Sequence, residues 1–427
     1  MTRIGTTFAA ALAVGLALVT AAPVAAAPPK GTCHNAEPGR PAVSEQPWAQ
    51  QAMDPRVAVW PHSTGDGVLV AVVDSGVDAD HPQLRAAGKV LAGQDFYLAG
   101  DYPGDFDCVS HGTAVASIIA ASRVDGIGFA GLAPDARILP VRVTERDVND
   151  NGDSQQINPG LLAKGIRYAA DGGARVINLS LAGLTDEPAV RSAVAYARKK
   201  DAVLVAAVGA PRQGEDPDQP SYPASYPGVL GVGAVDRTGE RLTSSRAGRQ
   251  VDIVAPGGAV LGATRVRGHQ YWDGSSFAAP FVSATAALVR AKYPKLSAAE
   301  VVERLRATTT PSPGGRGYGA GLVNPYRAVT DRLTADEPIA LAAAAPTPID
   351  PAHAREVAWW DRTGTIALAA TGLLGIAAVL GLVLVPAISR GRRRRWLATR
   401  AAPVAVERPL DGPPDEVFLF PAPNAER

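Results

Sequence analysis

Three residues of this 427-residue chain have side chains that could together carry out nucleophilic catalysis: Asp74, His111 and Ser276. Asp74 ends the apolar run VAVVD, His111 opens the apolar segment HGTAVASIIA, and Ser276 lies in DGSSFAAP, where another apolar segment begins. A serine hydroxyl is a weak nucleophile until a neighbouring base takes its proton, and a carboxylate can orient that base. The order Asp, His, Ser along a chain is one of three known for such triads.

Each of these residues also has a purely structural interpretation. Asp74 could start the turn DSG, because aspartate favours turns. A single histidine at the start of a helix is more often structural than catalytic. Ser275 and Ser276 could cap the helix that follows them, since a serine hydroxyl accepts a hydrogen bond from an unpaired backbone N–H. What the three candidates share is a position at the end of a strand or a helix.

The elements that must position these residues alternate between strands and helices. Runs that are apolar on both faces are typical of strands in a parallel sheet, and they predict strands at 67–73, 137–143, 174–180, 202–208 and 229–235. Helices are predicted at 112–122, 158–170, 187–200 and 275–292, and after the capping box of Ser297 and Glu300. The alternation predicts a doubly wound α/β domain with a mostly parallel sheet, in which ligands bind beyond the carboxyl ends of the strands.

The composition and the N-terminus favour an exported protein. Apolar residues make up 46% of the chain, and a net charge of +1 gives no reason to expect a nucleic-acid partner. Residues 1–27 contain Arg3, an apolar stretch and a small-residue end, which is the layout of a cleaved secretory signal peptide. An uncleaved N-terminal anchor is the alternative, but the apolar run is short. Residues 28–64 follow as an N-terminal extension without a clear period.

A second apolar segment predicts a membrane anchor. Residues 363–389 carry no charge and exceed the about 20 residues that span a bilayer core. Trp359 and Trp360 precede them, and the run RGRRRR follows. Positive charge stays on the cytoplasmic side, so the tail 390–427 would be cytoplasmic and the preceding chain, with its Ala/Pro-rich linker at 331–362, extracytoplasmic. The arginine cluster argues against the alternative of a buried core helix.

The chain resembles the subtilisin-like serine proteases in three signature segments: VAVVDSGVDADHPQL, HGTAVASIIA and GSSFAAPFVSATAALV. VINLSLAG resembles the family's substrate-binding strand, and SYPASYPGVLGVGAVD, VAPGG and GAGLVNPYRAV resemble its later core segments. The resemblance covers residues 65–330 in the family's order. The arrangement of the flanking segments is similar to that of a mycosin, a membrane-anchored subtilase of actinobacterial type VII secretion systems. These segments are the signal peptide, the short extension, the membrane helix and the arginine run that follows it.

The resemblance implies a role for each candidate residue. Ser276 would be the nucleophile, and His111 would be its base and then the acid that protonates the leaving amine. Asp74 would hold the imidazole in the correct tautomer. Three further residues would pair through their backbones with an extended peptide, as an added strand does: Ser180, Leu181 and Ala182.

The function implied by the resemblance is that of a membrane-anchored, extracytoplasmic serine endopeptidase without a cofactor or a metal. Its implied partners are a protein substrate in an extended conformation, the membrane and the type VII secretion membrane complex, and no nucleic acid. The alternative is a weakly active or inactive protease that serves as a structural component of the secretion complex. An esterase or lipase is a third reading, but the chain lacks a G-x-S-x-G elbow before a suitable helix.

One departure from the family pattern concerns the oxyanion that forms during hydrolysis. The family has AAGN after its AVLV strand, and the Asn amide donates to the oxyanion. This chain reads VAAVGAPRQGED, which places Ala210 at that position. Alanine has no side-chain donor, which leaves the backbone N–H of Ser276 and the loop 211–219, where Gln213 is a candidate. We therefore expect an intact but slow triad.

The two cysteines, Cys33 and Cys108, predict a disulfide. Two free thiols are the alternative, but an even count in an exported protein favours a bridge. The extension is too short for the folded pro-domain of many secreted subtilases, since an independent domain needs at least about 50 residues. In mycosins an extension of this kind packs along the catalytic domain, and the bridge would pin it near His111.

The segment DVNDNGDS, residues 147–154, fits the start of a calcium-binding loop, D-x-N-x-N-G. The twelfth position of such a loop needs a bidentate Glu, and here it is Asn158. A polar surface loop near the substrate cleft is therefore the favoured interpretation, and no metal site is predicted.

Overall fold

The computed structural model describes most of the predicted catalytic domain and part of the extension. The described residues are 33, 38–145, 157–212, 214–312, 314–333 and 388. The predicted signal peptide, membrane helix (apart from Ile388) and cytoplasmic tail lie outside them, as do Gln213 and residues 147–156 of the candidate calcium loop. The part of the chain that is described contains no helix that is both long and apolar enough to cross a membrane.

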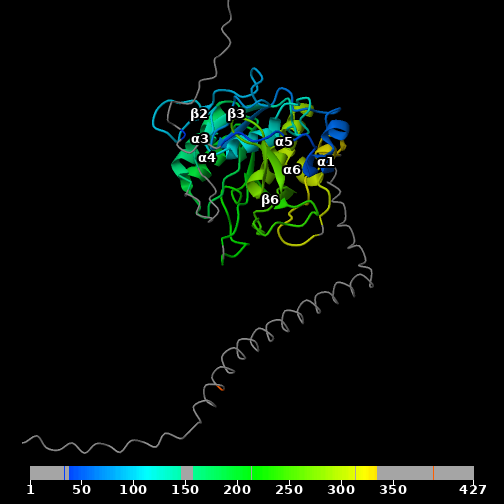
Figure 1. Ribbon diagram of the computed structural model, residues 1–427. Coiled ribbons are helices and arrows are strands. Elements are labelled where there is room, and N and C mark those ends of the chain that lie inside the picture. Colours follow the sequence, from blue (N-terminus) through cyan, green and yellow to red (C-terminus); the bar gives the residue numbers. More distant parts are fainter. Residues whose placement is uncertain are drawn as a thin grey trace, which may run out of the picture. The chain divides into compact units, whose positions relative to one another are not determined.

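Seven strands form a parallel sheet in the order β2-β3-β1-β4-β5-β6-β7 (Figure 1). The strands are β1 Leu69–Asp74, β2 Gln94–Asp95, β3 Arg137–Arg142, β4 Val176–Leu179, β5 Val203–Ala207, β6 Val229–Val235 and β7 Ile253–Pro256. The five predicted strands are confirmed to within two residues at each end. Their Val-rich and Ile-rich sequences suit this sheet because both of its faces are covered.

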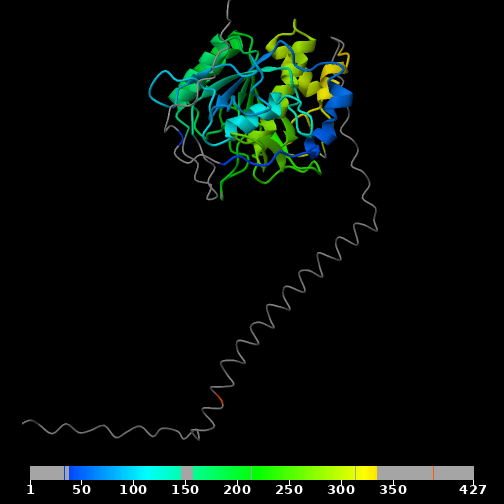
Figure 2. The same cartoon turned by 45° about the horizontal axis from the view of Figure 1, so that its top comes forward.

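Helices cover both faces of the sheet, as a doubly wound fold requires (Figures 1 and 2). They are α2 His111–Ala120, α3 Pro159–Asp171, α4 Pro188–Lys199, α5 Ser275–Lys292 and α6 Ala298–Ala307. Ile166 of α3 and Val194 of α4 belong to one apolar core, whereas Ile118 of α2 and Val282 of α5 belong to the other. The predicted α/β class with a mostly parallel sheet is confirmed, and the capping box of Ser297 and Glu300 is present.

Several short elements were not predicted from the sequence. They are α1 Trp48–Met53, the π-helix η1 Pro55–Val59, the strands β2 and β7, the antiparallel pair β8 Val260–Ala263 and β9 His269–Trp272, and α7 Pro325–Thr330. Each has six residues or fewer, which is too short for a hydrophobic period to be recognised. Tertiary contacts stabilise these elements, so their local sequence carries little signal.

The described part of the extension packs directly against the catalytic domain. The backbone N–H of Arg40 donates to Arg267 O at 2.9 Å, and that of Gly128 donates to Val43 O at 3.0 Å. The indole N–H of Trp48 donates to Ala259 O at 2.9 Å. These bonds, together with buried apolar side chains such as Val59, make residues 38–64 part of the same apolar core as α2 and α5.

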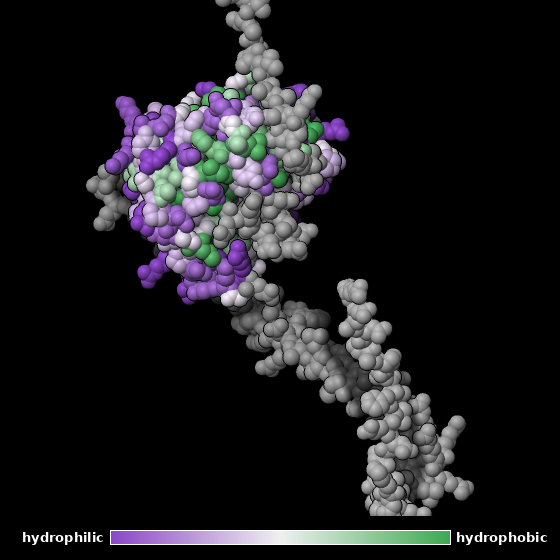
Figure 3. Space-filling view, turned by 90° about the vertical axis from the view of Figure 1, so that its left-hand side faces the viewer, coloured by the Kyte–Doolittle hydropathy of each residue, from purple (hydrophilic) through white to green (hydrophobic). Residues whose placement is uncertain are grey.

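Apolar side chains on the surface are scattered over several elements. Among the described residues, the exposed large apolar side chains are Val57, Val124, Leu184, Val266, Tyr271, Tyr326, Leu333 and Ile388. Figure 3 shows one face, on which apolar residues lie among polar ones. Exposed apolar residues of this kind are normal for a folded domain, and we assign no interface to them.

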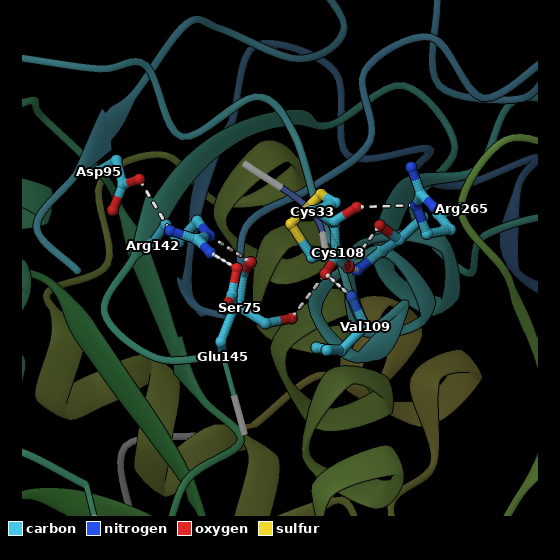
Figure 4. The surroundings of a disulfide bond; sticks show 10 residues. Cys33, Ser75, Asp95, Cys108, Val109, Arg142, Glu145 and Arg265 are labelled. Atoms are coloured by element: carbon cyan, nitrogen blue, oxygen red, sulfur yellow. Dashed lines mark hydrogen bonds and ion pairs between the residues drawn. A yellow bond between two sulfur atoms is a disulfide. The ribbon is translucent and has the colours of Figure 1, made fainter. Parts of the chain in front are cut away.

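The structure contains the predicted disulfide between Cys33 and Cys108 (Figure 4), which are 75 residues apart in sequence. We expect titration of the native protein to find no free thiol and titration after reduction and unfolding to find two. Closing a loop of this length restricts the unfolded chain, so the Cys33→Ser/Cys108→Ser variant should lose up to about 4 kcal/mol of unfolding free energy. Two reactive thiols before reduction would contradict the bridge.

His269 fastens the extension through a ring nitrogen that must stay unprotonated. The side-chain N–H groups of Gln83 donate to the carbonyls of Ser122 and Phe129, so its Oε1 accepts from His269 Nε2 at 2.6 Å. His269 Nδ1 consequently carries no proton, and it accepts the backbone N–H of Val43 at 3.2 Å. Protonation of Nδ1 would remove this bond between the extension and the domain.

We expect His269 to make the protein less stable as the pH falls from about 6.5 to 4. Burial, and secondly the nearby His81, lower the pKa of His269 from 6.5 to about 4. The unfolded chain then binds more protons than the folded one in this range. Lowering the pH from 6.5 to 4 therefore reduces the unfolding free energy, by about 3 kcal/mol in total. The measurement is urea unfolding between pH 4 and 8.

The matched variant for this measurement is His269→Asn, whose side-chain oxygen can still accept the Val43 N–H. Burial raises the pKa of Asp105 and of Asp107 to about 6, which acts on stability in the opposite direction, but wild type and variant share these groups. The difference between the two stability profiles therefore isolates His269. Parallel profiles between pH 4 and 6.5 would contradict the prediction.

Candidate active site

Two of the three candidate residues form a direct hydrogen bond in the structure. Asp74 ends β1 and His111 begins α2, and His111 Nδ1 lies 2.6 Å from Asp74 Oδ1. The same carboxylate oxygen accepts the backbone N–H of Ser75 at 2.7 Å. Asp74 is fully buried, and within the described part of the chain its Oδ2 has no hydrogen-bond partner. A buried carboxylate on Nδ1 selects the tautomer that leaves Nε2 as a proton acceptor.

The contact between β1 and α2 depends on a glycine beside His111. A Cβ atom at Gly112 would lie 2.1 Å from Gly76 O and 3.2 Å from Asp74 Cβ. No other residue could occupy position 112 without moving the helix away from the strand. The sequence shows that this position is small, but only the structure shows the carbonyl that requires it.

Ser276 is the second residue of α5, and neither it nor Ser275 caps the helix. The N-cap is Gly274, and no side chain makes a capping hydrogen bond. The capping interpretation of the two serines is therefore wrong. Ser275 Oγ accepts the backbone N–H of Gly209 at 2.9 Å, and Ser276 Oγ donates to Ser180 O at 3.0 Å. Both hydroxyls thus tie the start of α5 to the segments that follow β5 and β4.

An aromatic contact places the start of α5 beside His111. The ring of Phe277, the residue after Ser276, lies 5.0 Å from the His111 ring between centroids. The ring of Trp272 stacks on that of Phe277, with 4.9 Å between the ring centroids. Ser276 itself is partly exposed. The structure therefore brings all three candidate residues to the same edge of the sheet, where an approaching peptide could reach the hydroxyl.

The three predicted substrate-binding residues directly follow β4. Ser180 and Leu181 are buried and Ala182 is half-buried, and Gly183 forms a β-bridge with Tyr222. Ser180 does more than the sequence indicated, because its hydroxyl donates to Ser276 O at 2.6 Å. This bond and the one from Ser276 Oγ to Ser180 O form a reciprocal pair that holds the nucleophile candidate against β4.

Asn178, which was missed in the sequence, supports this pair from within β4. Its side chain is fully buried; Nδ2 donates to Ser180 Oγ at 2.9 Å, and Oδ1 accepts from Ser283 Oγ of α5 at 2.7 Å. A buried polar residue in an otherwise apolar strand was the available signal, since such groups need partners.

The resemblance to the subtilisin-like proteases implies that Ala210 corresponds to the Asn that binds the oxyanion in that family. Ala210 is exposed and follows Gly209, which has a φ of +76° and where a Cβ atom would lie 2.7 Å from Ala182 Cβ. A methyl group donates no hydrogen bond, so the backbone N–H of Ser276 is the remaining donor that the structure describes at this site. Space for a larger side chain exists because residue 210 faces solvent.

A large cavity lies away from the candidate active site, and the described residues form no cluster that could bind a metal ion. A cavity of about 940 Å³ is lined by Val203, Val229 and Ala298, which lie at the N-terminal ends of β5, β6 and α6. It is therefore at the opposite edge of the sheet from Asp74. No group of three or more His, Cys, Asp or Glu side chains within the described ranges could hold a metal ion.

Comparison with known proteins places this chain among the subtilases. The Subtilase family matches residues 65–328. Subtilisin E of Bacillus subtilis is 35% identical over 261 residues, which is 61% of this chain and 65%, slightly less than two thirds, of that protein. Mycosin-4 of Mycobacterium tuberculosis is 38% identical over 309 residues, covering 64% of this chain and 67% of that one. The crystal structure of MycP1 from the ESX-1 type VII secretion system matches with a TM-score of 0.60 at 30% identity, covering 73% of this chain and 91% of MycP1.

Proposed function

This chain belongs to the subtilase family, and we propose that it is a serine endopeptidase whose catalytic triad is Asp74, His111 and Ser276. The observation that carries the proposal is the 2.6 Å hydrogen bond between His111 Nδ1 and buried Asp74, formed beside the first turn of the helix that holds Ser276. A histidine and a serine with purely structural roles would not be expected to lie together at the carboxyl ends of parallel strands.

In the proposed reaction, Ser276 Oγ attacks the carbonyl carbon of the scissile peptide bond while His111 Nε2 takes the hydroxyl proton. The C–N bond then breaks as His111 returns this proton to the leaving amine, which gives an acyl-enzyme. A water molecule, deprotonated by His111, hydrolyses the ester and restores Ser276. Asp74 stabilises the imidazolium that forms in each step without itself becoming protonated.

The proposed substrate is an extended segment of another protein. Ser180, Leu181 and Ala182 would pair with it through their backbones. Strand pairing fixes the register of the peptide, so that its scissile bond lies over Ser276. A site of this kind recognises an exposed, unfolded segment, because a helix or a packed strand has no free backbone groups to offer.

We further propose that the protein is exported and held in the membrane by residues 363–389, with the catalytic domain outside and residues 390–427 in the cytoplasm. The support is the apolar length of this segment and the arginine run that follows it. Association with a type VII secretion system is proposed because the MycP1 relative is described as part of one.

A structural role in the secretion complex is the second candidate function, and the alanine at position 210 favours it. Mass spectrometry of exported proteins from a wild-type and a Ser276→Ala strain separates the two. Accumulation of an uncleaved exported protein in the Ser276→Ala strain supports the protease. Normal secretion and unchanged protein termini in that strain support the structural role, provided that deletion of the whole gene abolishes secretion.

A further inference from the structure

Behind the Asp74–His111 pair lies a second buried carboxylate, that of Asp107. It is only 2% exposed. Its Oδ1 accepts the Ser75 hydroxyl and the Val109 N–H, both at 3.0 Å. Its Oδ2 accepts the N–H and the hydroxyl of Thr113 at 2.9 and 2.7 Å. Every partner of this side chain is a donor.

Four donors fill the about four lone-pair sites of an ionised carboxylate. A proton on either oxygen would displace one of them, so the geometry around Asp107 is that of the charged form. Burial raises the pKa of Asp107 to about 6, and the charge of Asp74 adds to this, whereas the hydrogen bonds from Thr113 and Val109 lower it. Above about pH 6, the protein therefore carries a buried negative charge here.

Ser75 connects Asp107 to the Asp74–His111 pair. Its hydroxyl donates to Asp107 and accepts the Gly112 N–H at 2.9 Å. Its own N–H donates to Asp74 Oδ1, the oxygen that binds His111. Because Asp107 holds the hydroxyl proton of Ser75, this proton is not donated to Asp74, and Asp74 Oδ2 has no partner within the described structure.

Other charged groups approach this network from neighbouring elements (Figure 4). Arg142 of β3 donates Nε to Ser75 O at 3.1 Å and is itself paired with Asp95 and Glu145. Arg265, between β8 and β9, donates Nε to the backbone carbonyl of Asp107 at 3.0 Å. Asp74 of β1 therefore acts on Asp107 by its charge, and Arg265 binds the backbone of Asp107. Three further groups are connected to Asp107 through one of its neighbours: Arg142 through Ser75, His111 through Asp74, and Asp78 through its N–H bond to Thr113 Oγ1.

We propose that Asp107 is a positioning residue of the triad, which keeps the Ser75 hydroxyl from Asp74 and, by its negative charge, keeps His111 basic enough to accept the proton of Ser276. This inference rests on the proposed function of the three triad residues. Asp107 touches no substrate and acts through Ser75 and through space.

The test compares Asp107→Asn with wild type in full-length protein, using a fluorophosphonate probe. Ser276 Oγ forms a bond to phosphorus, fluoride leaves, and His111 takes the hydroxyl proton, so no natural substrate is needed. Labelling is slow at acid pH because His111 must be neutral. Loss of a nearby negative charge makes its protonation harder, so the acid limb of the rate profile should move to lower pH by roughly 0.5 to 1 unit, with a several-fold lower plateau. A lower plateau with an unshifted limb, or a shift to higher pH, overturns the proposal.

Asp78→Asn is the matched control, because it removes one negative charge from a half-exposed side chain of the same region. Water and salt screen that charge, so its acid limb should coincide with that of wild type, and an equal shift in both variants overturns the role of the Asp107 network. If wild type is not labelled on Ser276, the proposed function itself fails. If wild type is labelled and the Asp107→Asn limb does not move, only this inference fails.

Wild type provides a second measurement if Asp107→Asn does not fold. The proton between Asp74 and His111, whose atoms are 2.6 Å apart, should give a low-field NMR resonance. We expect this resonance to show, besides the titration of His111, a step near pH 6 as Asp107 becomes protonated. A single titration step overturns the proposal.

Discussion

Replacing Ser276 by alanine is expected to lower kcat for peptide hydrolysis by about 10³- to 10⁴-fold. Loss of the nucleophile in subtilisin costs about 10⁶ in kcat, but that enzyme has a complete oxyanion site. Ala210 already costs this chain about 10² to 10³ if the missing donor acts as it does in subtilisin, so less activity remains to be lost. The measurement is kcat and KM on an unfolded protein substrate, with KM expected to change little.

The effects of substitutions in the triad on kcat should also be non-additive. Removing His111 alone should cost about as much as removing Ser276, and the double variant should be no slower than either, because the residues act as one unit. Ser275→Ala is the matched control, since Ser275 is the adjacent serine of the same helix and its hydroxyl accepts the Gly209 N–H. A loss of less than tenfold for Ser276→Ala, or equal losses for Ser275→Ala, would show that Ser276 is not the nucleophile.

Ala210→Asn is expected to raise kcat by about 10²-fold and to leave KM nearly unchanged. The Asn amide would donate to the oxyanion, which exists only in the tetrahedral intermediate and the transition states around it. Position 210 is exposed and comes directly after Gly209, whose N–H is bonded to Ser275. The added side chain therefore has room, and it belongs to the residue next to Gly209, which is hydrogen-bonded to the first residue of α5. The measurement is again kcat and KM on the same protein substrate.

Two substitutions at the same position separate hydrogen bonding from shape. Ala210→Leu adds a side chain of similar size without a donor and should leave kcat within about threefold of wild type. Ala210→Asp has the shape of Asn but places a negative charge where the oxyanion develops, so it should lower kcat. If Asn and Leu have the same effect, the missing donor does not limit this enzyme.

The candidate catalytic residues could be chosen from the sequence, whereas their supporting residues could not. Asp74, His111 and Ser276 stand out because each is a reactive side chain at the end of an apolar run. Asp107, Ser75 and Asn178 stand next to or within similar runs, but their partners are distant in the sequence. Ser75 meets Asp107 over 32 positions, and Asn178 meets Ser283 over 105. No local pattern records such pairs.

The serines at the start of α5 show the same limit. Their types suit an N-cap, and sequence alone left capping and catalysis open. The structure excludes capping because the backbone turns at Gly274, with φ of +127°, one residue before the helix. Neither hydroxyl then bonds to the backbone N–H groups at the helix end. Instead, Ser275 Oγ accepts the Gly209 N–H, and Ser276 Oγ donates to Ser180 O.

By itself the sequence determined the order and type of the main strands and helices, the position of the reactive residues at their ends, and the pairing of the two cysteines. These follow from apolar period, capping chemistry and residue count, which act over a few neighbouring positions or involve few candidates. The tertiary structure decided which hydroxyl bonds to which carbonyl, why position 112 must be glycine, and that a second buried carboxylate lies behind Asp74. Those features depend on the approach of segments to within a few ångströms, and such distances arise only when the sheet and its helices pack together.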